Sequence, residues 1–154
     1  WATNLSSTPD TCQDSRLISP QIDLSAYSGE SIELSFWHWY DFRSSNYSGG
    51  RVEISTNGGS SWTPITPNQG YDSGKVNCSG GNSSCDPCEL DETSGAFTNE
   101  GNEQQWSQVS FDVSGYAGQT IQFALHFGNH AGYICCGAKD GWYIDEVAVV
   151  QSDC

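Results

Sequence analysis

Basic residues are scarce in this chain of 154 residues: five lysines and arginines stand against nineteen aspartates and glutamates. The formal net charge of −14 argues against binding to nucleic-acid backbones or anionic membranes, because both would repel the protein. No apolar run is long enough to cross a membrane, since the longest have the length of a β-strand. Such a surface suits a secreted protein, and we expect the chain to be a mature piece of a larger one.

Helical periodicity and catalytic motifs are also missing. No segment of useful length spaces its apolar residues at the period of a helix, so we expect an all-β protein. The HExxH, GxSxG and P-loop patterns are absent. Glu89, Asp91 and Glu92 could form a carboxylate pair, but a solvated acidic run is the default interpretation. The sequence therefore predicts a non-catalytic domain.

Methionine is absent as well, whereas glycine is abundant and tryptophan, tyrosine and phenylalanine number 6, 7 and 6. Together with many serines, threonines and asparagines, this composition is typical of a β-protein with long polar loops. The length fits one domain with a sizeable core, so we treat 1–154 as a single β-sandwich module.

Alternating apolar and polar residues predict seven β-strands. The longest alternation spans 31–42, and its even-numbered residues form an apolar face directed at a core. Trp37 and Trp39 occupy the opposite face, where either a second layer covers them or they form an aromatic binding surface. The Asn-Gly-Gly run at 57–59 predicts a tight hairpin, because these residues accept a positive φ. The predicted strands span 17–24, 31–42, 51–55, 62–65, 106–113, 120–127 and 141–150.

One segment of the chain occurs twice, at 22–34 and again at 111–123. Asp, Ser, Tyr, Gly and Ile recur at identical offsets, so each copy is expected to form a strand, a corner with a tyrosine and a second strand. Two such units facing each other predict an antiparallel β-sandwich of jelly-roll type. The same alignment matches Trp37 with His126 and predicts that both lie on the non-core faces of their strands.

Four motifs resemble a known family. They are Leu-Ser-Phe-Trp-His-Trp-Tyr-Asp-Phe at 34–42, Gly-Arg-Val-Glu-Ile-Ser-Thr-Asn-Gly-Gly-Ser-Ser-Trp at 50–62, Asp-Val-Ser-Gly-Tyr-Ala-Gly-Gln at 112–119 and Asp-Gly-Trp-Tyr-Ile-Asp-Glu-Val at 140–147. Over about residues 17–150 the chain is similar to the jelly-roll accessory domains of secreted bacterial metalloproteases of the immune-inhibitor-A type. MAM domains and galactose-binding-like β-sandwiches are similar too.

The resemblance implies a non-catalytic module attached to a hydrolase or a surface protein. Such jelly rolls often carry a structural calcium ion, and many relatives bind carbohydrate. The chain departs from the family in its enlarged connection at 72–96 and in Cys135 and Cys136, which precede the last strand.

Aromatic and polar side chains mix on the non-core face of the longest strand and its neighbour. Carbohydrate sites combine stacked aromatic rings with carboxylates, amides and guanidinium groups that bind the sugar hydroxyls. Loop aromatics could line the same end of the sandwich: Tyr47, Tyr71, Trp106 and Tyr133. The predicted ligand-binding residues are Trp37, Trp39, Asp41, Arg43, Arg51, Glu53 and His126.

Asp145 is the first candidate for a metal ligand. It follows Ile144 in the last strand, and a semi-buried carboxylate needs a cation or hydrogen-bond donors. Calcium takes six to eight oxygen ligands, which one strand cannot supply. Asp10 and Asp14, from an N-terminal segment expected beside the last strand, could add to the set. The alternative is that Asp145 caps a neighbouring turn.

Seven cysteines indicate an oxidising compartment, and their odd number leaves at least one unpaired within the chain or paired outside it. Cys12 and Cys154 flank the fold and could pair. The remaining five fall in two loops, at 78–88 and 135–136, so we expect disulfides to staple these loops together. A zinc site built from the same thiolates is the alternative. The long connection at 66–105, which holds three of the cysteines, has the length of a functional loop.

These patterns predict a secreted, non-catalytic carbohydrate-binding module that holds a covalently linked enzyme on polysaccharide. The alternative is a protein-interaction or processing domain of a secreted protease or surface protein, in which the same surface contacts polypeptide. Neither nucleic acid nor membrane is an expected partner.

Overall fold

The computed structural model describes residues 1–3, 13–42, 48–72, 76, 90, 94–98, 105–129 and 140–152. All seven cysteines lie outside these ranges, and with them the predicted disulfides and the zinc alternative. Within the same ranges no helix has the length and hydropathy needed to cross a membrane. The elements are β1 (Asp14–Ile18), β2 (Ile22–Asp23), η1 (Ser25–Tyr27), β3 (Ile32–Asp41), β4 (Ser48–Ser55), β5 (Thr63–Ile65), β6 (Ser107–Asp112), η2 (Ser114–Tyr116), β7 (Thr120–Asn129) and β8 (Gly141–Gln151).

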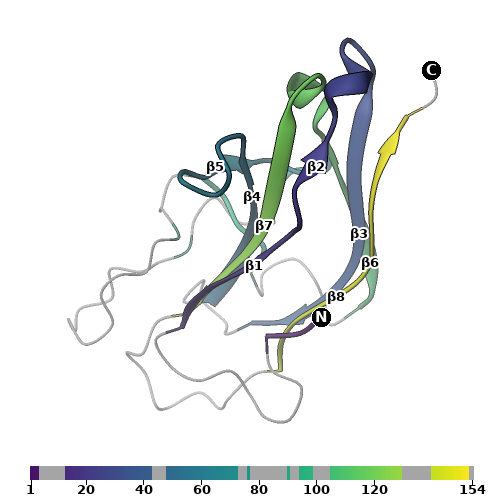
Figure 1. Cartoon of the computed structure of the whole chain (residues 1–154). Coiled ribbons are helices and arrows are strands. Elements are labelled where there is room, and N and C mark those ends of the chain that lie inside the picture. The colour runs from purple at the N-terminus through teal and green to yellow at the C-terminus, as the bar shows by residue number, and fades with distance from the viewer. Residues whose placement is uncertain are drawn as a thin grey trace.

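The strands form two antiparallel sheets that pack face to face (Figure 1). One sheet has the order β1-β7-β4-β5, with β2 also paired to β7, and the other has the order β6-β3-β8. The predicted all-β sandwich is thereby confirmed. Pro20 separates β1 from β2, because proline cannot donate a hydrogen bond to a neighbouring strand.

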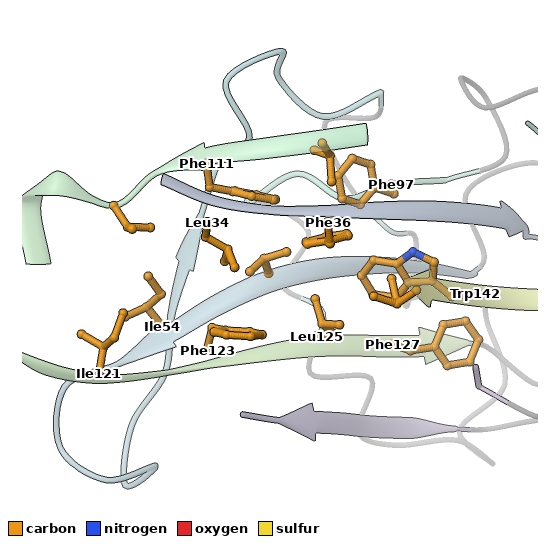
Figure 2. Packing of buried hydrophobic residues seen from close by; sticks show 14 of the residues in the cluster. Leu34, Phe36, Ile54, Phe97, Phe111, Ile121, Phe123, Leu125, Phe127 and Trp142 are labelled. Carbon is orange, nitrogen blue, oxygen red and sulfur yellow. The ribbon is translucent and has the colours of Figure 1, made fainter. Parts of the chain in front are cut away.

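The core fills the space between the two sheets, and β3 supplies its even-numbered residues. Ile32, Leu34 and Phe36 are buried, as the alternation in the sequence predicts. The phenyl rings of Phe36 and Phe111 stack with centroids 5.8 Å apart. Figure 2 shows these side chains meeting Leu125, Phe127 and others from the facing sheet. Burial of this many large apolar side chains, at roughly 1.5–3 kcal/mol each, is the main stabilising term of the sandwich.

The internal repeat of the sequence corresponds to two matching corners. In each, an aspartate carboxylate accepts the backbone N–H of the serine two residues later, at 2.9 Å in both: Asp23 with Ser25 and Asp112 with Ser114. This local bond favours the turn conformation, and η1 and η2 follow from it.

A glycine with a positive φ ends each corner, Gly29 at 84° and Gly118 at 86°. Each corner takes the chain from one sheet to the other, from β2 to β3 and from β6 to β7. Both corners lie at the same end of the sandwich, at the top of Figure 1. Leu24 joins them, because its N–H donates to Gln119 O and its carbonyl accepts the N–H of Gly118, both at 2.9 Å.

Phe97 comes from the long connection at 66–105 and lies in the core. It forms a two-way backbone bridge with Gly50 of β4, with N···O distances of 2.8 and 3.0 Å. The rings of Phe97 and Trp142 lie between the sheets with centroids 6.0 Å apart (Figure 2). The sequence pattern did not predict this contact, because Phe97 is an isolated apolar residue in a polar segment.

We expect Gly50→Ala to destabilise the protein by about 2–3 kcal/mol, because a Cβ at Gly50 would overlap the buried Trp142 ring. The matched control is Gly115→Ala, where a Cβ would meet no atom within 4 Å. Urea unfolding followed by tryptophan fluorescence measures both. Equal stability of the two variants would contradict this packing.

His38 is a buried member of β3, as the sequence predicts. Its ring meets Phe97 edge-on with centroids 4.6 Å apart, and its Nδ1 accepts the Trp142 Nε1–H at 3.4 Å. Burial lowers the pKa of His38 from 6.5 to about 4, because the charged form would lose its hydration. The folded protein therefore holds a neutral imidazole that the unfolded chain protonates more readily.

This difference predicts a loss of stability in mild acid. Between pH 6.5 and about 4 the unfolded chain binds more protons at His38, so the free energy of unfolding falls as the pH falls, by about 3 kcal/mol at pH 4. In His38→Phe this contribution is absent. Chemical denaturation at pH 7 and pH 4 should therefore show a smaller difference for the variant than for the parent protein. Identical pH dependence in both proteins would contradict the assignment.

Candidate functional site

The structure distributes the predicted site residues over the two outer faces of the sandwich. Trp37, Trp39 and Asp145 belong to the sheet β6-β3-β8. A second group lies on β1, β4 and β7 of the other sheet and consists of Asp14, Arg51, Glu53 and His126. The two groups are separated by the core, so they form two clusters and not one site.

Trp37 is the centre of the first cluster. It is 37% exposed and points away from the core, as the alternation predicts. Asp145 of β8 lies opposite it on one side, and Gln108 of β6 lies opposite it on the other. Trp106, which is 51% exposed, stands two residues before Gln108 and so on the same face. Two tryptophan side chains therefore lie close together on the outer face of this sheet.

A β-bulge adds a second carboxylate to this face. Between the pairs Ser35–Ala148 and Trp37–Asp145, β3 has one residue and β8 has two, and the register shifts there. Glu146 occupies the bulge with a φ of 50°, which is strained for a residue with a side chain. In a regular strand Glu146 would point into the core, but in the bulge both Asp145 and Glu146 are exposed.

These four side chains line a cleft of about 340 Å³: Trp37, Trp106, Asp145 and Glu146. Its size is near the lower end of the range of roughly 300–1,000 Å³ for small-molecule sites. The Asp145 carboxylate is oriented by its Oδ1, which accepts the Glu146 N–H at 2.9 Å. Ring faces beside hydrogen-bond acceptors can hold a flat molecule that is apolar on its faces and polar at its edges.

Trp39 lies on the same face of the sheet but is only partly exposed. It is half-buried, and its ring meets Tyr143 of β8 edge-on with centroids 5.4 Å apart. Asp41 lies two residues further along β3, opposite Gly141, and is buried. Arg43 falls outside the described residues. Of the predicted β3 residues, Trp37 is therefore the one that lines the cleft.

The second cluster is a buried network of charges. Glu53 is its centre, with a side chain only 1% exposed, and its carboxylate oxygens accept Arg16 Nε at 2.9 Å and Arg51 Nε at 2.7 Å. His126 Nδ1 lies 2.9 Å from Glu53 Oε1, and His126 Nε2 contacts Asp14 Oδ1. His126 lies outside the core cluster but is fully covered.

The network keeps Glu53 ionised. Burial by itself raises the pKa of this carboxyl, but hydrogen bonds from His126 and Arg16, with the charges of His126 and Arg51, lower it to about 2. The opposite charges pair inside the protein, and these pairs join β1, β7 and β4. Little of Arg51, Glu53 or His126 is therefore exposed to a ligand.

We expect Glu53→Gln to destabilise the protein by about 3 kcal/mol at pH 7, because it removes the carboxylate around which the arginines and His126 gather. The difference should shrink as the pH falls from about 4.5 towards 2, where the native Glu53 becomes protonated. Guanidinium unfolding across this range measures it. Glu30→Gln, an exposed position, is the control, and an equally small effect of both would contradict a central role of Glu53.

The predicted calcium ligands are not brought together. Asp14 binds His126 on the sheet that contains β1, Asp145 lies on the opposite sheet, and Asp10 is outside the described residues. In the described ranges no group of three or more His, Cys, Asp or Glu side chains is placed to hold a metal ion. Calcium binding stays a prediction from the sequence.

A larger cavity, of about 430 Å³, lies beside His38 on the inner side of β3. Several of its polar groups already bond within the protein. Tyr40 Oη donates to Asp72 Oδ2 at 2.6 Å, and Asp72 Oδ1 accepts the N–H of Thr98 at 2.8 Å. Tyr71, a loop aromatic of the sequence prediction, is likewise engaged, since it donates to Ile65 O at 2.7 Å. The tryptophan cleft differs from this cavity in its lining of two exposed tryptophans and two exposed carboxylates.

The sequence prediction missed Glu146 and treated Trp106 only as an aromatic at the edge of a loop. A signal was present for Glu146, because Asp145-Glu146 puts two charges in succession into a strand that buries one face. A bulge is one way for both charges to stay out of the core. Other residues of interest lie outside the described ranges: Tyr47, Glu89, Asp91, Glu92, His130 and Tyr133.

No family model matches this chain, and no curated protein is significantly similar to it in sequence.

Proposed function

We propose that this domain is a non-catalytic carbohydrate-binding module, and that Trp37 and Trp106 form its sugar-binding platform. The observation that supports the proposal is the cleft in which these two exposed rings stand beside Asp145 and Glu146. Pyranose rings present C–H faces that pack on indole and hydroxyl edges that donate to carboxylates. The cleft supplies both kinds of contact in one place.

The arrangement of the sheet supports binding to a chain of sugars. Trp37 lies on β3 and Trp106 directly precedes the neighbouring strand β6, and the half-buried Trp39 with Tyr143 continues the aromatic surface along β3 and β8. An extended ligand can lie along such a surface. In this proposal the domain is secreted and is covalently linked to a catalytic domain that it holds on polysaccharide.

The proposal predicts that the protein is retarded in native gels that contain a soluble polysaccharide, and that Trp37→Ala reduces the affinity roughly tenfold or more. A large share of binding energy in small sites comes from one or two aromatic side chains. A panel of neutral and charged soluble polysaccharides, with pull-down on cellulose and chitin, makes the measurement.

Tyr27→Ala is the matched control, because Tyr27 is 40% exposed but lies in η1, away from the cleft. It should bind like the parent protein. If none of the glycans retards the protein, the proposal is wrong. Binding of a polypeptide that competes at Trp37, with no glycan bound, would favour a protein-interaction domain instead.

A further inference from the structure

The charge of the tryptophan cleft restricts its ligand more closely than its aromatic rings do. Both polar side chains that line it, Asp145 and Glu146, are carboxylic acids, and both are exposed. Carboxylates accept hydrogen bonds but donate none, so this site is complementary to a ligand rich in donors.

Arginine and lysine side chains are far from the cleft within the described part of the chain, although the N-terminal ammonium of Trp1 donates to the carbonyl of Ile144 on β8 at 2.8 Å. The only arginines or lysines there are Arg16 and Arg51, and both bind Glu53 on the opposite sheet. The chain as a whole carries a net charge of −14. An anionic ligand, such as a uronic acid or a sulfated sugar, would be repelled by the carboxylates and by the whole protein.

The bulge in β8 indicates that the pair of carboxylates is specifically constructed. A regular strand would place Asp145 and Glu146 on opposite faces, whereas the bulge leaves both on the cleft at the cost of a strained φ at Glu146. Strain of this kind, roughly 1–3 kcal/mol, persists where the surrounding structure enforces it and is concentrated at binding sites.

Ring faces and carboxylates share one further preference, which is for cations. An ammonium group is attracted to the face of an indole, more strongly to tryptophan than to other aromatic side chains, and it pairs with carboxylates. Trp37 and Trp106 with Asp145 and Glu146 offer both attractions within a cleft of about 340 Å³. A neutral sugar would use only part of this set.

We propose that the ligand is a glycan with free amino groups, a polymer of 2-amino-2-deoxy sugars, whose ammonium group lies between the carboxylates while its ring packs on the tryptophans. This inference rests on the proposed function and names the class of sugar. The recognised feature is the protonated amine, so N-acetylation of the sugar removes it.

The test compares three oligosaccharides of equal length by titration calorimetry in mildly acidic buffer: glucosamine oligomers, their N-acetylated forms and neutral cello-oligosaccharides. The intact domain should bind the amino oligomer roughly tenfold more tightly than the other two. The preference should weaken at high salt, because the carboxylates are exposed.

Two variants separate charge from stacking. In Glu146→Gln the preference for the amino oligomer should fall severalfold while binding of the neutral oligomers changes little. In Trp37→Ala all binding should fall. Circular dichroism verifies that both are folded, and Glu30→Gln, an exposed acid near the far end of β8, should keep the preference.

The outcomes distinguish this inference from the proposed function. Equal affinity for amino, N-acetylated and neutral oligomers, lost in Trp37→Ala, would overturn the amino-sugar ligand and leave a carbohydrate-binding module. Binding of no oligosaccharide of any kind would overturn both. Binding of a lysine-rich peptide at Trp37 without binding of the amino oligomer would overturn the inference in favour of a cationic polypeptide.

Discussion

The structure depends on the alternation of side chains along β3. Because neighbouring residues of a strand point to opposite faces, the same ten residues, Ile32–Asp41, supply apolar groups to the core and tryptophans to the outer face. β3 lies between β6 and β8, so a shift of its register by one residue would exchange the two faces. Burial of the apolar face fixes the register of β3. This register in turn fixes the positions of the tryptophans on the outer face.

The two outer faces of the sandwich use polar residues in different ways. On the sheet of β1, β7 and β4 the buried side chains of Arg51 and His126 pair with Glu53, which leaves little of them for a ligand to contact. On the sheet of β6, β3 and β8 the acids are exposed beside tryptophan rings. A buried charge without partners is too costly to keep, whereas an exposed acid needs no partner from the protein. The second face is therefore the one on which the proposed function depends.

Much of the fold could be predicted from the sequence, because local patterns determine it. The alternation at 31–42 and the two Asp-x-Ser corners became β3, η1 and η2, with the core on the expected side. The predictions failed for contacts that the periodicity and spacing of residues in the sequence do not encode. Phe97 reaches the core as one apolar residue of a polar segment, and Glu146 changes face because of a bulge. The burial of His126 depends on charges from two other strands, Asp14 on β1 and Glu53 on β4.

The bridge between Gly50 and Phe97 fixes one point of the long connection between β5 and β6. The entropy of closing a loop depends on its length between fixed ends, so an anchor in the middle makes each part behave as a shorter loop. A change of length earlier in the connection then leaves Trp106, which follows the anchor, in its place beside Trp37.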